Sequence, residues 1–269
     1  MAASTLAPAL MLLYHGLERA QQPCDARFTL SCAAFYDHLW LLRRRQQRGE
    51  ITVVSLASWW QGKACQGRPV VLCFDDGRSS DAEVALPALV KFGMPASFFL
   101  STAHIGKPGY LTWNGVEALR RAGMGIESHG HDHRPFTQFP AAVLAEQLRT
   151  SRHMLQDHAG TPVHFLAAPY GLWNRHVFRA ALQAGFSALC TSHPGLASPR
   201  APRLARNGIL AHTSARQLQR WLAGRPGSFV WPISRDYLLW TPKYILMHCP
   251  SLRQHVVPLP AGDHSASTF

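Results

Sequence analysis

The sequence predicts an α/β protein built on a parallel sheet, and three observations support this. Apolar runs alternate with helical patterns over most of the chain, which is typical of successive βα units. Seven or eight such units favour a barrel over an open sheet, and a length of 269 residues suits one large α/β domain. Two polar segments, Asp75-Asp76-Gly77 and 129–133, directly follow predicted strands, where barrels place their functional groups.

The predicted strands are short apolar runs that end in polar or glycine residues. The run 70–74 is apolar throughout and ends abruptly in two carboxylates, which indicates a fully buried strand. The complete set of predicted strands is 9–14, 51–54, 70–74, 96–100, 125–128, 164–168, 187–191 and 207–210.

Helices are predicted between the strands, where apolar residues recur at helical spacing between capping residues. Ser31 is expected to cap a helix that carries Phe35, Leu39 and Leu42 on one face and ends near Gly49. Further helices are expected at 141–159, at 174–184, and from a capping box at Ser214 and Gln217 to Leu222.

The pattern changes at Arg225, after which prolines interrupt any long helix. We therefore predict a barrel domain over 1–224 and an irregular C-terminal extension over 225–269. A separate domain of this length would bury too little surface to fold alone.

Composition excludes a disordered chain, because 47% of the residues are hydrophobic and only 16% are charged. The net charge of +12 suits an anionic partner, such as a membrane surface, nucleic acid or acidic glycan, or simply a basic solvated surface. No motif of a nucleic-acid-binding module is present, so no nucleic acid partner is expected.

The cellular location is predicted from the cysteines and the N-terminal segment. Six cysteines without CxxC spacing favour a reducing compartment. Residues 1–13 are apolar but lack a positive leading region, which indicates a first strand rather than a signal peptide. No apolar stretch reaches the length of about 20 residues that a transmembrane helix needs. We therefore expect a cytoplasmic protein, with a peripheral position at a membrane as the alternative.

One carboxylate and two histidines that converge from separate strand ends are typical of a catalytic zinc site with an open position for water. The carboxylate that is left over can then act as a general base. An Asp-Gly pair after a strand is also common in ordinary turns, so the acids indicate a metal site only together with the histidines. The i,i+4 spacing of His129 and His133 predicts a helical turn that directs both rings toward one ion.

These segments resemble the polysaccharide deacetylase family (NodB homology, carbohydrate esterase family 4). The family motif T-F-D-D-G is similar to residues 73–77, and H-(S/T)-x-x-H is similar to 129–133, with Gly130 at the hydroxyl position. The motif R-x-P-Y matches at Pro169-Tyr170, where Ala167 replaces the arginine. The resemblance extends from about Leu10 to about Leu222.

The resemblance implies a distorted (β/α)7 barrel and assigns a role to each site residue. Asp76, His129 and His133 would bind a divalent metal, with Zn²⁺ as the first choice and Co²⁺, Ni²⁺ or Mn²⁺ also compatible. Asp75 would be the general base, and the backbone N–H of Tyr170 would bind the oxyanion. The replacement by Ala167 removes the usual charge partner of Asp75 and leaves the tuning of that carboxylate open.

Two histidines are candidates for the general acid. His15 follows the first predicted strand and would open onto the same barrel face, as in family members with an early Tyr-His pair. His248 ends an apolar run, as in the family's late motif, but lies in the proline-rich extension. We favour His15 because it follows a barrel strand.

The resemblance implies a metal-dependent hydrolase that removes acetyl groups from N-acetylated amino sugars of a polysaccharide or oligosaccharide. Two alternatives stay open: a hydrolase of non-sugar amide or imide bonds on the same barrel, and an inactive glycan-binding homologue. The expected partner is an N-acetylated glycan in either sugar-binding case.

Overall fold

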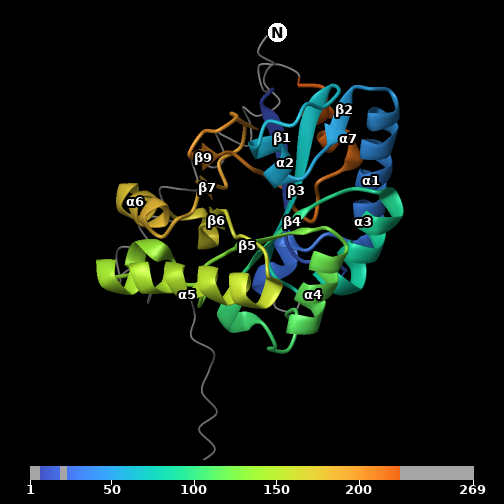
Figure 1. Ribbon diagram of the computed structural model, residues 1–269. Coiled ribbons are helices and arrows are strands. Elements are labelled where there is room, and N and C mark those ends of the chain that lie inside the picture. The colour runs from blue at the N-terminus through green and yellow to red at the C-terminus, as the bar shows by residue number, and fades with distance from the viewer. Residues whose placement is uncertain (1–6, 19–22, 225–269) are drawn as a thin grey trace, which may run out of the picture. The chain divides into compact units, whose positions relative to one another are not determined.

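Figure 1 shows the fold of the chain as a computed structural model, which describes residues 7–18 and 23–224. The strands form one sheet in the order β10-β1-β3-β4-β5-β6-β7-β9, with β2 added beside β3 and β8 antiparallel to β1. The strands are β1 (Ala9–Tyr14), β2 (Ile51–Val53), β3 (Arg68–Asp76), β4 (Ser97–Leu100), β5 (Gly125–Ser128), β6 (Phe165–Ala167), β7 (Ala188–Cys190), β8 (Leu196–Ala197), β9 (Arg203–Leu204) and β10 (Asn207–Gly208).

The central strands pair in parallel and curl into a nearly closed barrel, so the predicted distorted α/β barrel is confirmed. The two ends of the sheet, β9 and β10, are neighbours in sequence and only two residues long. Two short strands, β8 and β9, were not predicted, and β3 is longer than the predicted strand 70–74 because it extends to Asp76 and includes both carboxylates. The predicted extension 225–269, with His248, lies outside the described residues.

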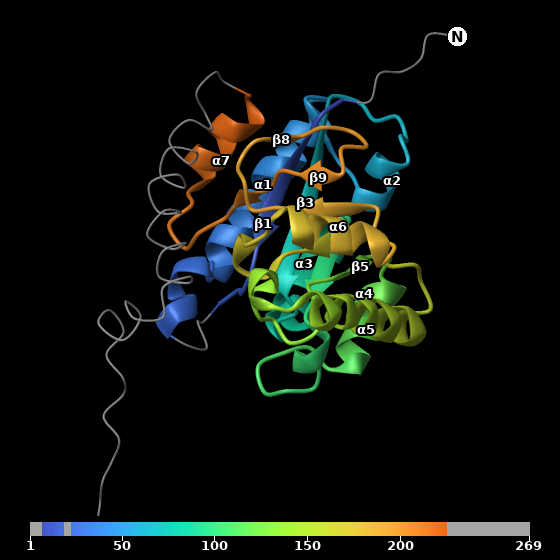
Figure 2. The same cartoon turned by 90° about the vertical axis from the view of Figure 1, so that its left-hand side faces the viewer.

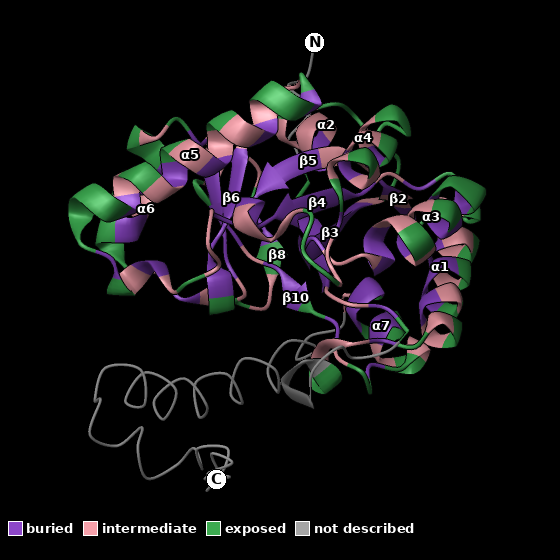
Figure 3. Cartoon of the chain, turned by 90° about the horizontal axis from the view of Figure 1, so that it is seen from below, coloured by how far each residue is buried: buried purple, intermediate pink, exposed green. Residues whose placement is uncertain are grey.

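Helices surround the barrel and cover the outer face of the sheet (Figures 2 and 3). The predicted apolar face of the first helix is buried, and the Ser31 hydroxyl accepts the N–H of Ala34. Asn174 and Ser214 cap later helices in the same way. The helices are α1 (Cys32–Gln47), α2 (Leu56–Trp60), α3 (Leu86–Phe92), α4 (Trp113–Arg121), α5 (Ala141–Ala159), α6 (Arg175–Gln183) and α7 (Ala215–Leu222). Within residues 7–18 and 23–224, no helix has the length and apolar character to cross a membrane.

The barrel interior is filled by alternate side chains of the strands. Met11 and Leu13 of β1 pack with Val71 and Cys73 of β3 in this core. Because side chains alternate between the two faces of a strand, Asp75 must follow Val71 and Cys73 into the interior. Regular strand geometry therefore directs a carboxylate to the inside of the barrel at its carboxyl end.

Candidate active site

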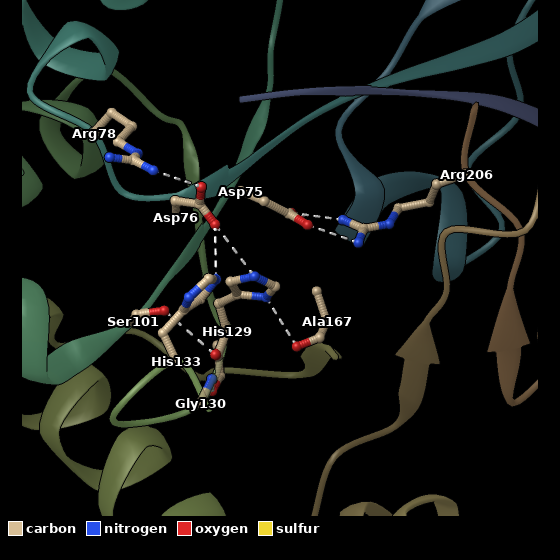
Figure 4. A network of polar contacts seen from close by, with 10 residues as sticks. Asp75, Asp76, Arg78, Ser101, His129, Gly130, His133, Ala167 and Arg206 are labelled. Carbon is tan, nitrogen blue, oxygen red and sulfur yellow. Dashed lines mark hydrogen bonds and ion pairs between the residues drawn. The ribbon is translucent and has the colours of Figure 1, made fainter. Parts of the chain in front are cut away.

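The two adjacent carboxylates of β3 point in different directions, as Figure 4 shows. Asp75 keeps the strand conformation and is directed into the barrel toward Arg206. Asp76, the last residue of β3, has a left-handed backbone with φ of 80°, so its side chain departs from the regular direction of a strand residue. The Asp76 carboxylate consequently faces His129 and His133.

Three side chains converge at this point with the geometry of a metal site. Asp76 Oδ1 lies 3.4 Å from His129 Nε2 and 3.1 Å from His133 Nε2. Tetrahedral ligands at the usual bond length of about 2.0–2.1 Å are separated by about 3.3 Å, so these spacings fit an ion at their centre. Among the residues that the structure describes, this is the only such group of histidine, cysteine and carboxylate side chains.

His129 is held in the tautomer that a metal ligand requires. Its ring is buried directly after β5, and Nδ1 lies 3.0 Å from the carbonyl oxygen of Ala167 in β6. Because a carbonyl can only accept, Nδ1 carries the proton and Nε2 keeps its lone pair toward Asp76. Ala167, the residue at the position of the expected arginine, thus contributes its backbone to the site.

His133 reaches the site through an irregular loop, so the predicted helical turn over 129–133 is wrong. Its backbone is left-handed, with φ of 57°. Gly130 explains why the loop can bend: its φ is +81°, and a Cβ atom there would lie 2.7 Å from the Phe136 ring. A serine or threonine at position 130 would clash with the Phe136 ring in this conformation, so glycine suits the loop as it is folded here.

Backbone strain is concentrated at the site. The described part of the chain holds five non-glycine residues with positive φ, and three of them are Asp76, His133 and Tyr170. Such conformations cost about 1–3 kcal/mol each and persist where the surrounding structure imposes them. Here the sheet and its short connections impose them, and the result is a preformed set of site residues.

Asp75 has a charge partner, which corrects the expectation drawn from Ala167. Arg206 lies in the β9–β10 connection and donates to both Asp75 oxygens, at 2.7 and 2.9 Å. Burial alone would raise the pKa of Asp75, but the charge and the two hydrogen bonds of Arg206 outweigh burial and hold the pKa below its usual value. Asp75 is therefore ionised, as the predicted general base must be.

Arg206 is fixed by further contacts in the barrel interior. Its Nε donates to the carbonyl of Thr191 at 3.1 Å, and its guanidinium lies 5.0 Å from the centroid of the Phe99 ring. Sequence analysis missed this residue because 131 positions separate it from Asp75. The only feature of the sequence that could have pointed to Arg206 was its position directly before the predicted strand 207–210.

The variant Arg206→Gln is expected to raise the pKa of Asp75, because burial then acts without the compensating charge. A base is active only when ionised, so the acid limb of the pH–rate profile should move to higher pH. Loss of one partner of a buried ion pair should also lower the free energy of unfolding by about 3–5 kcal/mol. Arg206→Lys, which keeps the charge, should shift the limb less, whereas an unchanged limb in Arg206→Gln would contradict the assigned tuning.

His15, the predicted general acid, is close to the metal-ligand set. It follows β1, the neighbour of β3, and lines the same cavity as Asp76. Its Nδ1 is buried and has no hydrogen-bond partner among the described residues. Burial lowers the pKa of the ring, which favours release of a proton, whereas the charges of Asp76 and Asp75 act in the opposite direction.

Tyr170 lies beside His133. It occupies a short turn after β6, with φ of 60° and ψ of 7°, and its ring centroid is 5.0 Å from that of His133. The side chain is 49% exposed, so the ring forms part of the rim of the site. His131 does not join the ligands, because its Nδ1 lies 2.8 Å from the hydroxyl of Thr102.

The sequence of this chain is similar to those of known proteins. The family model described as polysaccharide deacetylase matches residues 62–189. YxkH of Bacillus subtilis is 28% identical over 51% of this chain and 50% of its own length. The poly-β-1,6-N-acetyl-D-glucosamine N-deacetylase of Staphylococcus epidermidis is 29% identical over 45% of this chain and 48% of its own length. The chain thus spans about half the length of these curated relatives.

Solved structures share the fold. The deacetylase PplD of Streptococcus pyogenes matches with a TM-score of 0.72 and 21% identity, over 80% of this chain and 98% of that one. IcaB from Ammonifex degensii matches with a TM-score of 0.69 and 21% identity, over 81% of this chain and 96% of that one.

Proposed function

Because the chain belongs to the polysaccharide deacetylase family, we propose that it is a metal-dependent hydrolase that releases acetate from N-acetylated amino sugars of a polysaccharide or oligosaccharide. The observation that carries this proposal is the convergence of Asp76, His129 and His133 beside the buried Asp75–Arg206 ion pair. A complete ligand set next to an ionised carboxylate also argues against an inactive glycan-binding homologue.

The ligand set fits a divalent cation, with Zn²⁺ first and Co²⁺, Ni²⁺ or Mn²⁺ compatible with the same donors. When bound, such an ion polarises the acetyl carbonyl and lowers the pKa of a nearby water. The hard carboxylate and the two imidazoles of the site are the donors that these ions accept.

The remaining chemistry is assigned to residues of the chain. Asp75 takes the proton of the attacking water, and Arg206 keeps Asp75 ionised for this step. The backbone N–H of Tyr170 donates a hydrogen bond to the oxyanion that forms as the water oxygen bonds to the carbonyl carbon. His15 then donates a proton to the nitrogen as the C–N bond breaks, which yields acetate and a free amine.

The test is acetate release from N-acetylglucosamine oligomers with β-1,4 and β-1,6 linkages. We expect one free amine for each acetate, loss of activity with a chelator, and recovery when Zn²⁺ or Co²⁺ is added back. Absence of acetate from the metal-loaded protein with both linkages would contradict the proposal for these glycans. Hydrolysis of cyclic imides under the same conditions would favour the non-sugar alternative.

The variant His15→Ala should bind metal normally but lose about 10²-fold in kcat, because the leaving amine would depart unprotonated. An acetyl ester with a phenolic leaving group needs no such proton, so its hydrolysis should fall much less. A near-wild-type rate on the amide substrate at saturating metal would remove His15 from the mechanism.

A further inference from the structure

A cavity of about 210 Å³ extends from the proposed metal site between two chain segments. One wall consists of residues that follow β1, including His15 and Glu18, and the other consists of Asp76 at the end of β3 and residues of the segment that follows it, up to Glu83. Phe28 and Thr29 complete the lining. His15 and Asp76 belong to both the cavity and the proposed site, so a bound glycan can occupy both. The buried and unpartnered Nδ1 of His15 lines this space and offers a polar contact to a ligand.

Each wall of the cavity carries one exposed carboxylate. Glu18 and Glu83 are exposed, whereas Asp76 is buried, so the two glutamates lie toward the mouth and Asp76 lies toward the inner end. The chain has only 15 acidic residues and a net charge of +12, so two carboxylates on one cavity depart from the general charge of the protein. Glu83 forms no ion pair with any residue that the structure describes.

The cation that lines the same cavity is directed toward its inner end. The guanidinium of Arg78 lies 3.4 Å from Asp76 Oδ2 and 4.8 Å from the centroid of the Tyr110 ring. Its side chain is only 13% exposed. A second cation lies beside the cavity, because the Arg27 guanidinium is 4.4 Å from the centroid of the Phe28 ring, which lines it. The described lining itself holds three carboxylates, from Glu18, Asp76 and Glu83, and one guanidinium, from Arg78.

Hydrogen bonds hold Glu18 in a defined position and join the two walls. The N–H of Leu17 donates to the hydroxyl of Ser80 at 3.1 Å, which ties the wall after β1 to the wall after β3. The thiol of Cys32 donates to Glu18 Oε1 at 3.0 Å, and the backbone N–H of Glu18 donates to Leu30 at 2.9 Å. The carboxylate of Glu18 is thus oriented by the protein before any ligand arrives.

We propose that this cavity is a subsite for the protonated amine of an amino sugar that has already lost its acetyl group. The inference rests on the proposed deacetylase function and narrows its substrate class to partially deacetylated chains. An ammonium group has three donors and a positive charge, which complement two carboxylates at a cavity mouth. The free amine that one hydrolysis produces then helps the same glycan to bind for the next hydrolysis.

The direct test is binding of a fully deacetylated glucosamine tetramer, which the enzyme cannot hydrolyse. Calorimetry would compare the wild type, Glu83→Gln, the double variant Glu18→Gln/Glu83→Gln, and Asp157→Asn as a control for loss of an exposed acid on α5. We expect Kd to rise about fivefold in the double variant and less in Glu83→Gln, as for exposed ion pairs. The difference should shrink at high salt, where charges are screened.

A second measurement compares acetate release from an N-acetylglucosamine tetramer with release from the same tetramer carrying one free amine. The wild type should prefer the partially deacetylated tetramer in kcat/KM, and the double variant should lose the preference. No acetate from either tetramer would contradict the proposed function, while calorimetry would still test the subsite. Equal Kd values for the fully deacetylated tetramer in the wild type and the folded double variant would overturn the proposed subsite. Binding of a second divalent ion that requires both glutamates would also overturn it.

Discussion

Replacing His133 with alanine should abolish metal binding and acetate release together while the barrel stays folded. The ring supplies one of three ligand atoms and lies in a loop, where its removal leaves the strands intact. Mutation of a residue that only hydrogen-bonds to a metal ligand typically weakens metal binding by about 10–100-fold. Loss of a direct ligand should weaken it by more than this. Metal content would be measured by elemental analysis, activity by the rate of acetate release, and folding by circular dichroism.

The matched control is His131→Ala, which removes the histidine between the two ligands in sequence. Because His131 contacts Thr102 rather than Asp76, this variant should keep its metal. His129→Ala should behave like His133→Ala, with an added loss of stability because the His129 ring is buried. Full metal occupancy in either ligand variant would refute the assignment.

Replacing Asp75 with asparagine should leave the metal bound but lower kcat by about 10²–10⁴-fold, the usual contribution of a general base. Asp75 points to Arg206 and Asp76 to the histidines, so the two acids should have separable roles. Metal content and kcat at saturating metal would be measured for Asp75→Asn and Asp76→Asn side by side.

Folding must be controlled in this comparison, because Asp75→Asn leaves Arg206 buried without its counter-charge. A loss of about 3–5 kcal/mol in the free energy of unfolding is expected, so rates should be taken where circular dichroism shows a native spectrum. Loss of metal in folded Asp75→Asn with retention in Asp76→Asn would mean that the two roles are exchanged.

The pairing of Asp75 with Arg206 also relates catalysis to the barrel core. The ion pair is buried at the top of the apolar interior that Met11, Val71 and Cys73 fill. In such surroundings a carboxylate without a partner would become protonated near neutral pH. The proposed base is thus kept ionised by an arginine from the segment that joins the two ends of the sheet.

The sequence by itself predicted most strands of the barrel, several of its helices and the residues of the proposed metal-ligand set. Strands and capped helices follow from local patterns, such as the apolar run before Asp75 and the hydroxyl of Ser31, because these depend on neighbours in the chain. The convergence of Asp76, His129 and His133 was predictable because parallel strands bring their carboxyl ends to one edge.

Only the tertiary structure decided how these residues are oriented and supported. The left-handed backbones of Asp76 and His133 are imposed by surrounding contacts rather than by local preference, which would disfavour them. Arg206 reaches Asp75 across 131 positions, and Glu18 comes to the same cavity as Glu83 only because β1 pairs with β3. Contacts of this kind depend on which strands become neighbours, and a pattern read along the chain does not contain that information.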